Sequence, residues 1–142
     1  MTVHLFTGLD DPWAWALRVV RKAQREGRLL WVLVPGADVN RVLSRWCAAD
    51  PQGFLSLAPP RAAMPVRRHS RIHVFDADEA PNEVPSDAHL LHLAPLVHPL
   101  AASFDTVLDA VGLDDTEVQA GRRRFRAYQA MGLEVRHRPT TP

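Results

Sequence analysis

The part of this sequence with the most chemical potential is a short basic and aromatic segment near the C-terminus. Residues 121–132 read Gly-Arg-Arg-Arg-Phe-Arg-Ala-Tyr-Gln-Ala-Met-Gly, with four arginines in five positions beside two aromatic rings. A guanidinium group can bind a carboxylate or phosphate through two parallel hydrogen bonds. An aromatic ring next to it offers an apolar contact. The segment therefore suits an anionic ligand that also carries an apolar group.

The spacing within this segment predicts an amphipathic helix. Arg122 and Arg126 lie four residues apart, at the margin between the apolar face and solvent. Arg123 and Arg124 are expected to point further outward. Residues that recur at three- and four-residue intervals form the face expected to pack on a sheet: Val118, Gly121, Phe125, Tyr128 and Gly132.

Three interpretations of the arginines remain open at this point. A solvated basic helix end is favourable near the negative end of the helix dipole. A nucleic-acid patch is the second interpretation, although the formal net charge of the chain is only +1. The third is a pocket for an acidic peptide, in which arginines bind carboxylates and an aromatic wall holds an apolar side chain.

The rest of the chain alternates strand-like and helix-like segments, which would position the basic helix. Apolar or alternating runs predict strands at residues 3–7, 29–34, 71–75 and 88–93. Helices are expected from Asp10 or Asp11 to Gly27, and from about Asp38 through Trp46. Short strand–helix–strand connections predict right-handed βαβ units and a parallel sheet.

Residues 104–111 fit either a helix or a strand. We favour a strand because this β-rich run stands directly before Gly112 and before a capped helix. That last helix, which carries the arginines, is expected to begin at Asp114 or Asp115 and to end at Gly132.

Together these elements predict a single α/β domain over residues 1–138, with three layers (α/β/α) and a mostly parallel sheet of about five strands. Residues 49–70 contain four prolines and are expected to be a long connection with little regular structure. Residues 76–87 are acidic and are expected to form a loop. A tail is expected from Arg136, of which residues 139–142 are assigned as flexible and outside the domain.

The sequence has no motif that predicts a cofactor, a metal site or a catalytic centre. Thr7-Gly8-Leu9-Asp10 and Pro35-Gly36-Ala37-Asp38 follow the first two strands without the glycine pattern of a dinucleotide site or the lysine of a phosphate loop. His89 and His92 should lie on opposite faces of one strand, so they are not expected to share a metal. One cysteine, no long apolar run and no visible signal peptide predict a cytoplasmic protein without membrane contact.

Beyond these arguments, the C-terminal helix resembles that of a known family. Arg-Arg-Phe-Arg-Ala-Tyr followed by Gln-Ala-Met-Gly-Leu is similar to the chi subunit of bacterial DNA polymerase III, and the likeness extends in pattern over most of the chain. The resemblance implies a non-catalytic clamp-loader accessory subunit with a nucleotide-binding-like fold and no cofactor. Such a subunit links the replicase to single-stranded DNA-binding protein by holding its acidic C-terminal tail, and contacts DNA only indirectly.

The resemblance also implies roles for individual residues. The tail ends in a phenylalanine, whose free carboxylate would be bound by Arg122 and whose ring would enter a pocket formed by Val111 and Phe125. Arg126 would bind the acidic residues of the tail, and Arg124 is a further candidate.

A second interface of the family uses a tryptophan and a phenylalanine to bind the psi subunit or a helicase-like partner. Trp46 and Phe54 are the equivalents implied here, while Trp46 could equally be part of the helix core. Two other functions stay open: a small α/β nucleotide-binding enzyme, and a direct single-stranded DNA binder.

Overall fold

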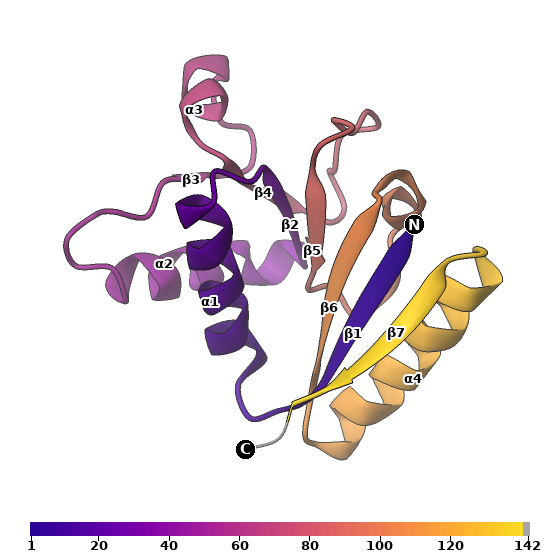
Figure 1. The fold of residues 1–142 in the computed structure, drawn as a ribbon. Coiled ribbons are helices and arrows are strands. Elements are labelled where there is room, and N and C mark those ends of the chain that lie inside the picture. The colour runs from indigo at the N-terminus through magenta and orange to yellow at the C-terminus, as the bar shows by residue number, and fades with distance from the viewer. Residues whose placement is uncertain (141–142) are drawn as a thin grey trace.

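The structure is a computed structural model that describes residues 1–140, and it contains one seven-stranded sheet (Figure 1). The strands are β1 (Thr2–Leu9), β2 (Leu30–Val34), β3 (Leu57–Ala58), β4 (Ile72–Asp76), β5 (His89–His92), β6 (Thr106–Gly112) and β7 (Glu134–Pro139). Their order in the sheet is β3-β4-β2-β5-β6-β1-β7, and every neighbouring pair is parallel. The predicted α/β class and parallel sheet are confirmed, but the predicted number of about five strands is too low.

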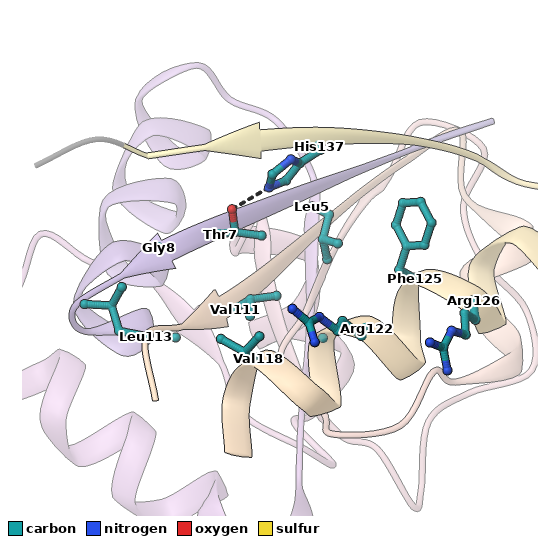
Figure 2. Close-up of a pocket in the computed structure, with 12 residues that line it drawn as sticks. Leu5, Thr7, Gly8, Val111, Leu113, Val118, Arg122, Phe125, Arg126 and His137 are labelled. Atoms are coloured by element: carbon teal, nitrogen blue, oxygen red, sulfur yellow. Dashed lines mark hydrogen bonds between the residues drawn. The ribbon is translucent and has the colours of Figure 1, made fainter. Parts of the chain in front are cut away.

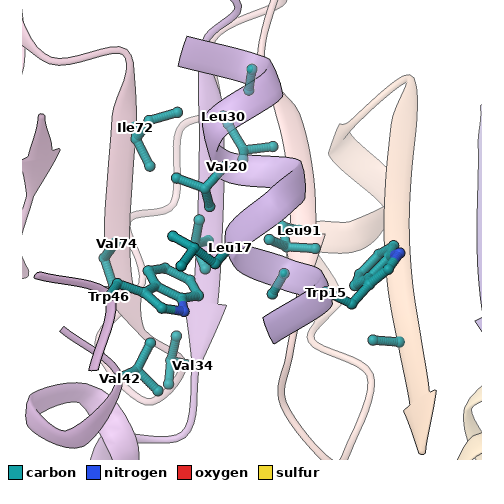
Figure 3. Close-up of a cluster of buried hydrophobic side chains, with 14 of the residues drawn as sticks. Trp15, Leu17, Val20, Leu30, Val34, Val42, Trp46, Ile72, Val74 and Leu91 are labelled. Carbon is teal, nitrogen blue, oxygen red and sulfur yellow. The ribbon is translucent and has the colours of Figure 1, made fainter. Parts of the chain in front are cut away.

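Helices pack on both faces of this sheet. They are α1 (Pro12–Arg25), α2 (Val39–Ala48), α3 (Met64–His69) and α4 (Asp115–Ala130), with short 3-10 helices at Gly36–Asp38 and Pro99–Ser103. On one face, α1 and α2 contribute Val20 and Trp46 to a core cluster (Figure 3). On the other face, Tyr128 of α4 packs into a second cluster. None of the helices in the described part of the chain is long and apolar enough to span a membrane.

Strand β2 belongs to both clusters because it is buried on its two faces. Leu30, Val32 and Val34 contact the cluster under α1 and α2, whereas Trp31 and Leu33 belong to the cluster on the α4 side. Side chains alternate between the faces of a strand. The continuous apolar run predicted as a buried strand is therefore what a central parallel strand requires.

The helices α1 and α4 are capped by residues that the sequence predicts for this role. The Asp11 side chain caps α1 by accepting a hydrogen bond from the Ala14 amide at 3.2 Å. Asp114 caps α4 by accepting from the Glu117 amide at 2.8 Å. Gly132 follows α4 with φ of +79°, a conformation that favours glycine.

The expected long irregular connection over residues 49–70 contains regular structure. Strand β3 pairs with β4, and α3 follows it before β4 begins. Both elements are short: the strand has two residues and the helix six. Such short pieces carry little periodicity, and the prolines around them hide it further.

The prediction of a C-terminal tail from Arg136 is wrong for most of that segment. Residues from Glu134 to Pro139 form β7, which pairs with β1 in register. Thr140, assigned to the flexible tail, donates hydrogen bonds to the Thr7 carbonyl oxygen from its amide (3.0 Å) and its hydroxyl (2.7 Å). Residues 141–142, the rest of that tail, lie outside the described residues.

Candidate functional site

A cavity of about 630 Å³ lies between α4, from Val118 to Arg126, and the strands β1 and β6 (Figure 2). Strand β7 forms its outer side through His137. Parallel strands end at a common edge, so the segments that leave them meet there, and ligands often bind at that edge. The residues that line the cavity are Leu5, Thr7, Gly8, Val111, Gly112, Leu113, Val118, Gly121, Arg122, Phe125, Arg126 and His137.

Two guanidinium groups give this cavity a positive charge. Arg122 and Arg126 are exposed side chains one helical turn apart on α4, and both line the cavity. Within residues 1–140, neither has an ion-pair or hydrogen-bond partner, and none of the residues lining the cavity is acidic. Their donors are therefore available to an external carboxylate or phosphate.

The cavity has an apolar floor and wall between these charges. Val111 of β6 is buried at the floor, and the half-buried Phe125 stands on α4 between the two arginines in sequence. Leu113, just after β6, is 57% exposed and borders the cavity at the other end. The structure thus brings together four residues predicted for the site: Val111, Arg122, Phe125 and Arg126.

Gly121 lets α4 approach β6 closely at this point. A Cβ atom on Gly121 would lie 2.7 Å from Cγ2 and 2.9 Å from Cγ1 of Val111, well inside normal contact distance. Any larger residue would push the helix away from the strand or displace Val111. The glycine of the basic segment therefore sets the distance between the arginines and the floor.

His137 is a cavity residue that the sequence did not predict. Its Nε2 atom lies 2.6 Å from Oγ1 of Thr7, which also lines the cavity (Figure 2). The segment was expected to be a tail, so no position relative to α4 could be assigned to it. His137 lies at the cavity because β7, a charged and polar edge strand, pairs with β1.

Arg124 does not point outward, contrary to the prediction, and does not line the cavity. It is 4% exposed, and its Nε and Nη2 atoms donate to the carboxylate of Asp109 at 3.0–3.2 Å. Nη1 donates to the Pro95 carbonyl oxygen at 3.3 Å, and Nη2 also donates to that of Ala110 at 3.1 Å. All three nitrogens are engaged inside the protein, so Arg124 is a buried structural residue rather than a ligand-binding one.

Asp109 is the centre of a buried polar network. The hydroxyl of Tyr128 donates to Oδ2 of Asp109, and Tyr128 is fully buried, which agrees with its expected place in the core. Nδ1 of His92 lies 3.8 Å from the same oxygen, while Nε2 accepts from the amide of His98 at 3.1 Å. Burial lowers the pKa of His92 to about 4. Because this network is closed off from solvent, its role is to fix α4 on the sheet.

The second predicted interface pair is not assembled as one surface. Trp46 is completely buried in the core cluster under α1 and α2 (Figure 3). Its indole Nε1 donates to the carbonyl oxygen of Trp13 at 3.3 Å. Phe54 is 72% exposed. Trp46 is therefore part of the helix core and not of a partner surface. Of the two residues, only Phe54 is accessible to a partner.

The histidines and acidic side chains of the described residues form no group of three or more that could hold a metal ion. His89 and His92 occupy opposite faces of the sheet, as predicted: one is on the α1 side and the other contacts Tyr128.

Comparison with known proteins bears on the identity of the chain. A search of curated protein sequences found no significant match. A family model described as "DNA polymerase III chi subunit, HolC" matches residues 1–136 of the 142. The match includes β1, β6, all of α4 and the first part of β7, and so every cavity residue except His137. The chain belongs to the DNA polymerase III chi subunit (HolC) family.

Proposed function

We propose that this chi-family protein binds the acidic C-terminal tail of single-stranded DNA-binding protein in the cavity beside α4. Membership of the family makes it an accessory subunit of DNA polymerase III. The observation that supports the finer proposal is the meeting, in one cavity, of an apolar floor and two arginines that have no ion-pair partner among the described residues. That combination suits a peptide end which carries both negative charge and a ring.

In this proposal, each side chain has a separate task. Arg122 binds the free carboxylate at the end of the tail through a charge-assisted, bidentate contact. The terminal ring of the tail enters between Val111 and Phe125, where burial of apolar area adds to affinity. Arg126, one turn further along α4, binds an acidic residue upstream of the ring.

The proposed role is adaptation rather than catalysis. The protein would link the clamp loader to single-stranded DNA-binding protein in the cytoplasm, and the cavity beside α4 would contact DNA only through that partner. No cofactor is needed for such a role. The exposed Phe54 is the residue that we propose for contact with a second partner, either psi or a helicase-like protein.

The affinity for the isolated tail should be modest. A short peptide must become ordered when it binds, which offsets part of the contact energy. We expect a Kd on the order of micromolar. Because both arginines are exposed, the affinity should fall as the salt concentration rises.

Replacement of Arg122 by alanine tests this assignment. The variant should bind an acidic peptide that ends in phenylalanine about 30-fold more weakly, a loss of roughly 2 kcal/mol. Fluorescence anisotropy with a labelled peptide measures the change. Arg123→Ala is a matched control, since Arg123 is the next residue on the same helix, is exposed and does not line the cavity. Equal losses in the two variants would contradict a specific contact at Arg122.

A further inference from the structure

A second concave surface lies on the opposite side of the sheet from α4. There, α1 and α2 pack over β2, β4, β5 and β6, and Figure 1 shows β1 and β7 extending beyond these two helices. A cavity of about 470 Å³ lies between α1 and this open face. Its floor includes the half-buried side chains of Phe6 and Leu108, and Val19 of α1 forms a wall.

Positive charge predominates around this cavity. Lys22, Arg28 and Arg138 line it, whereas Glu26 is its one carboxylate among the described residues. Glu26 is only at the limit of contact with two of these cations, at 4.0 Å from Lys22 and 3.9 Å from Arg28. Arg138 has no ion-pair partner within residues 1–140.

Two histidines are placed against the arginines at opposite ends of the cavity. Nε of Arg138 donates to Nδ1 of His4 at 3.2 Å, and Nη1 of Arg28 donates to Nε2 of His89 at 3.0 Å. A guanidinium group can only donate, so each imidazole accepts through a nitrogen that carries no proton. Burial and the nearby arginines lower the pKa of both histidines. Each guanidinium group is thus oriented by a neutral ring, and of the two only Arg28 also has a carboxylate of the described residues nearby, Glu26 at 3.9 Å.

This arrangement fits a polyanion with flat apolar groups between its charges. Arg138 contacts His4 of β1 and Arg28 contacts His89 of β5, and β6 lies between these two strands. This separation suits successive phosphates better than a single carboxylate group. Phe6, His4 and His89 line the same cavity, and aromatic rings provide stacking surfaces for bases. An open sheet face with basic and aromatic side chains is a common platform for single-stranded nucleic acid.

We propose that this second cavity binds single-stranded DNA, with phosphates held by Arg138 and Arg28 and a base lying on the ring-bearing floor between them. The site is separate from the peptide cavity, because the two have no lining residue in common. It would let the protein contact the strand directly while its other face holds a protein partner. The proposal does not depend on the identity of the ligand beside α4.

Anisotropy of a fluorescein-labelled oligothymidine of about 12 nucleotides tests the site in the full-length protein. Arg138→Glu and Arg28→Glu should each weaken binding about tenfold, and each should reduce the slope of log K against log salt by about 0.7, the value for one lost phosphate contact. Arg25→Glu changes the net charge equally but lies outside this cavity. It should change affinity less than twofold, as should Arg122→Glu in the peptide cavity. Thermal unfolding checks that each variant is folded.

Three results would overturn the proposal. They are undetectable binding of the oligonucleotide by the wild-type protein, equal weakening by Arg25→Glu and Arg138→Glu, and displacement of the oligonucleotide by an acidic peptide whose own binding requires Arg138. The last result would assign the cavity to a protein partner. Loss of DNA binding in Arg138→Glu with peptide binding unchanged would support two independent sites.

Discussion

At the scale of single residues, the structure divides the arginines of α4 by their partners. Arg124 meets the carboxylate of Asp109 inside the protein, whereas Arg122 and Arg126 line a cavity to which residues 1–140 contribute no acidic side chain. A buried guanidinium needs a carboxylate and carbonyl oxygens, since an unpaired buried charge is costly. Neighbouring residues of one type therefore have different functions: one fixes the helix and two are available to a ligand.

The buried network also makes stability depend on pH. His92 titrates near pH 4 in the folded protein and near 6.5 when unfolded. Between these values the unfolded state binds more protons, so the folded state loses stability as the pH falls, by about 3 kcal/mol in total for this group. Urea unfolding at pH 7 and pH 4 should therefore show a smaller difference for His92→Gln than for the wild type. His69→Gln, at an exposed position, is the control and should keep the wild-type difference. An unchanged difference in His92→Gln would contradict a neutral, buried imidazole.

At the scale of elements, the distance between α4 and β6 determines the shape of the peptide cavity. Val111 and Gly121 meet where the helix crosses the strand, and no side chain larger than glycine fits between them. Rigid contact here holds Arg122 and Phe125 at a fixed distance from the floor. The edge strand β7 then completes the outer side through His137.

Gly121→Ala tests this contact. Alanine favours the helix by about 1 kcal/mol, but overpacking against Val111 should cost about 1–3 kcal/mol and move α4 outward. We expect lower stability in urea unfolding together with weaker peptide binding. The double variant Gly121→Ala/Val111→Ala makes space for the added methyl group and should recover part of both losses relative to the sum of the single variants. Strict additivity of the two substitutions would contradict direct contact between these positions.

At the scale of the whole molecule, strong local patterns made most of the sheet and three of its covering helices predictable. The run of Leu and Val residues in β2 and the capped α4 have clear periodicity, and they lie where the sequence places them. Strand β7 could not be found in this way, because an edge strand with Glu134, Arg136 and Arg138 exposed has almost no apolar face. Without β7, the sequence could not locate His137.

The candidate site was predictable only where local spacing determines the position of a residue. Helical spacing put Arg122 and Arg126 on one margin of α4, and they do line one cavity. The position of Arg124 depends on Asp109, which lies 15 residues earlier on another element. The only indication of this buried pair in the sequence is weak: Asp109 is a single carboxylate within an otherwise apolar strand. Pairing at such a distance depends on tertiary structure and is not encoded in local spacing.

The proposed tail contact is tested most directly by titrating one peptide in two forms. An acidic peptide ending in phenylalanine, with either a free carboxylate or an amide at its C-terminus, is titrated calorimetrically into the wild type and into Arg122→Ala. Amidation should weaken binding to the wild type by about 2 kcal/mol and should have little further effect in Arg122→Ala, since the carboxylate and the guanidinium are partners. Equal affinity of both peptide forms for the wild type, or an equal loss on amidation in both proteins, would contradict the account.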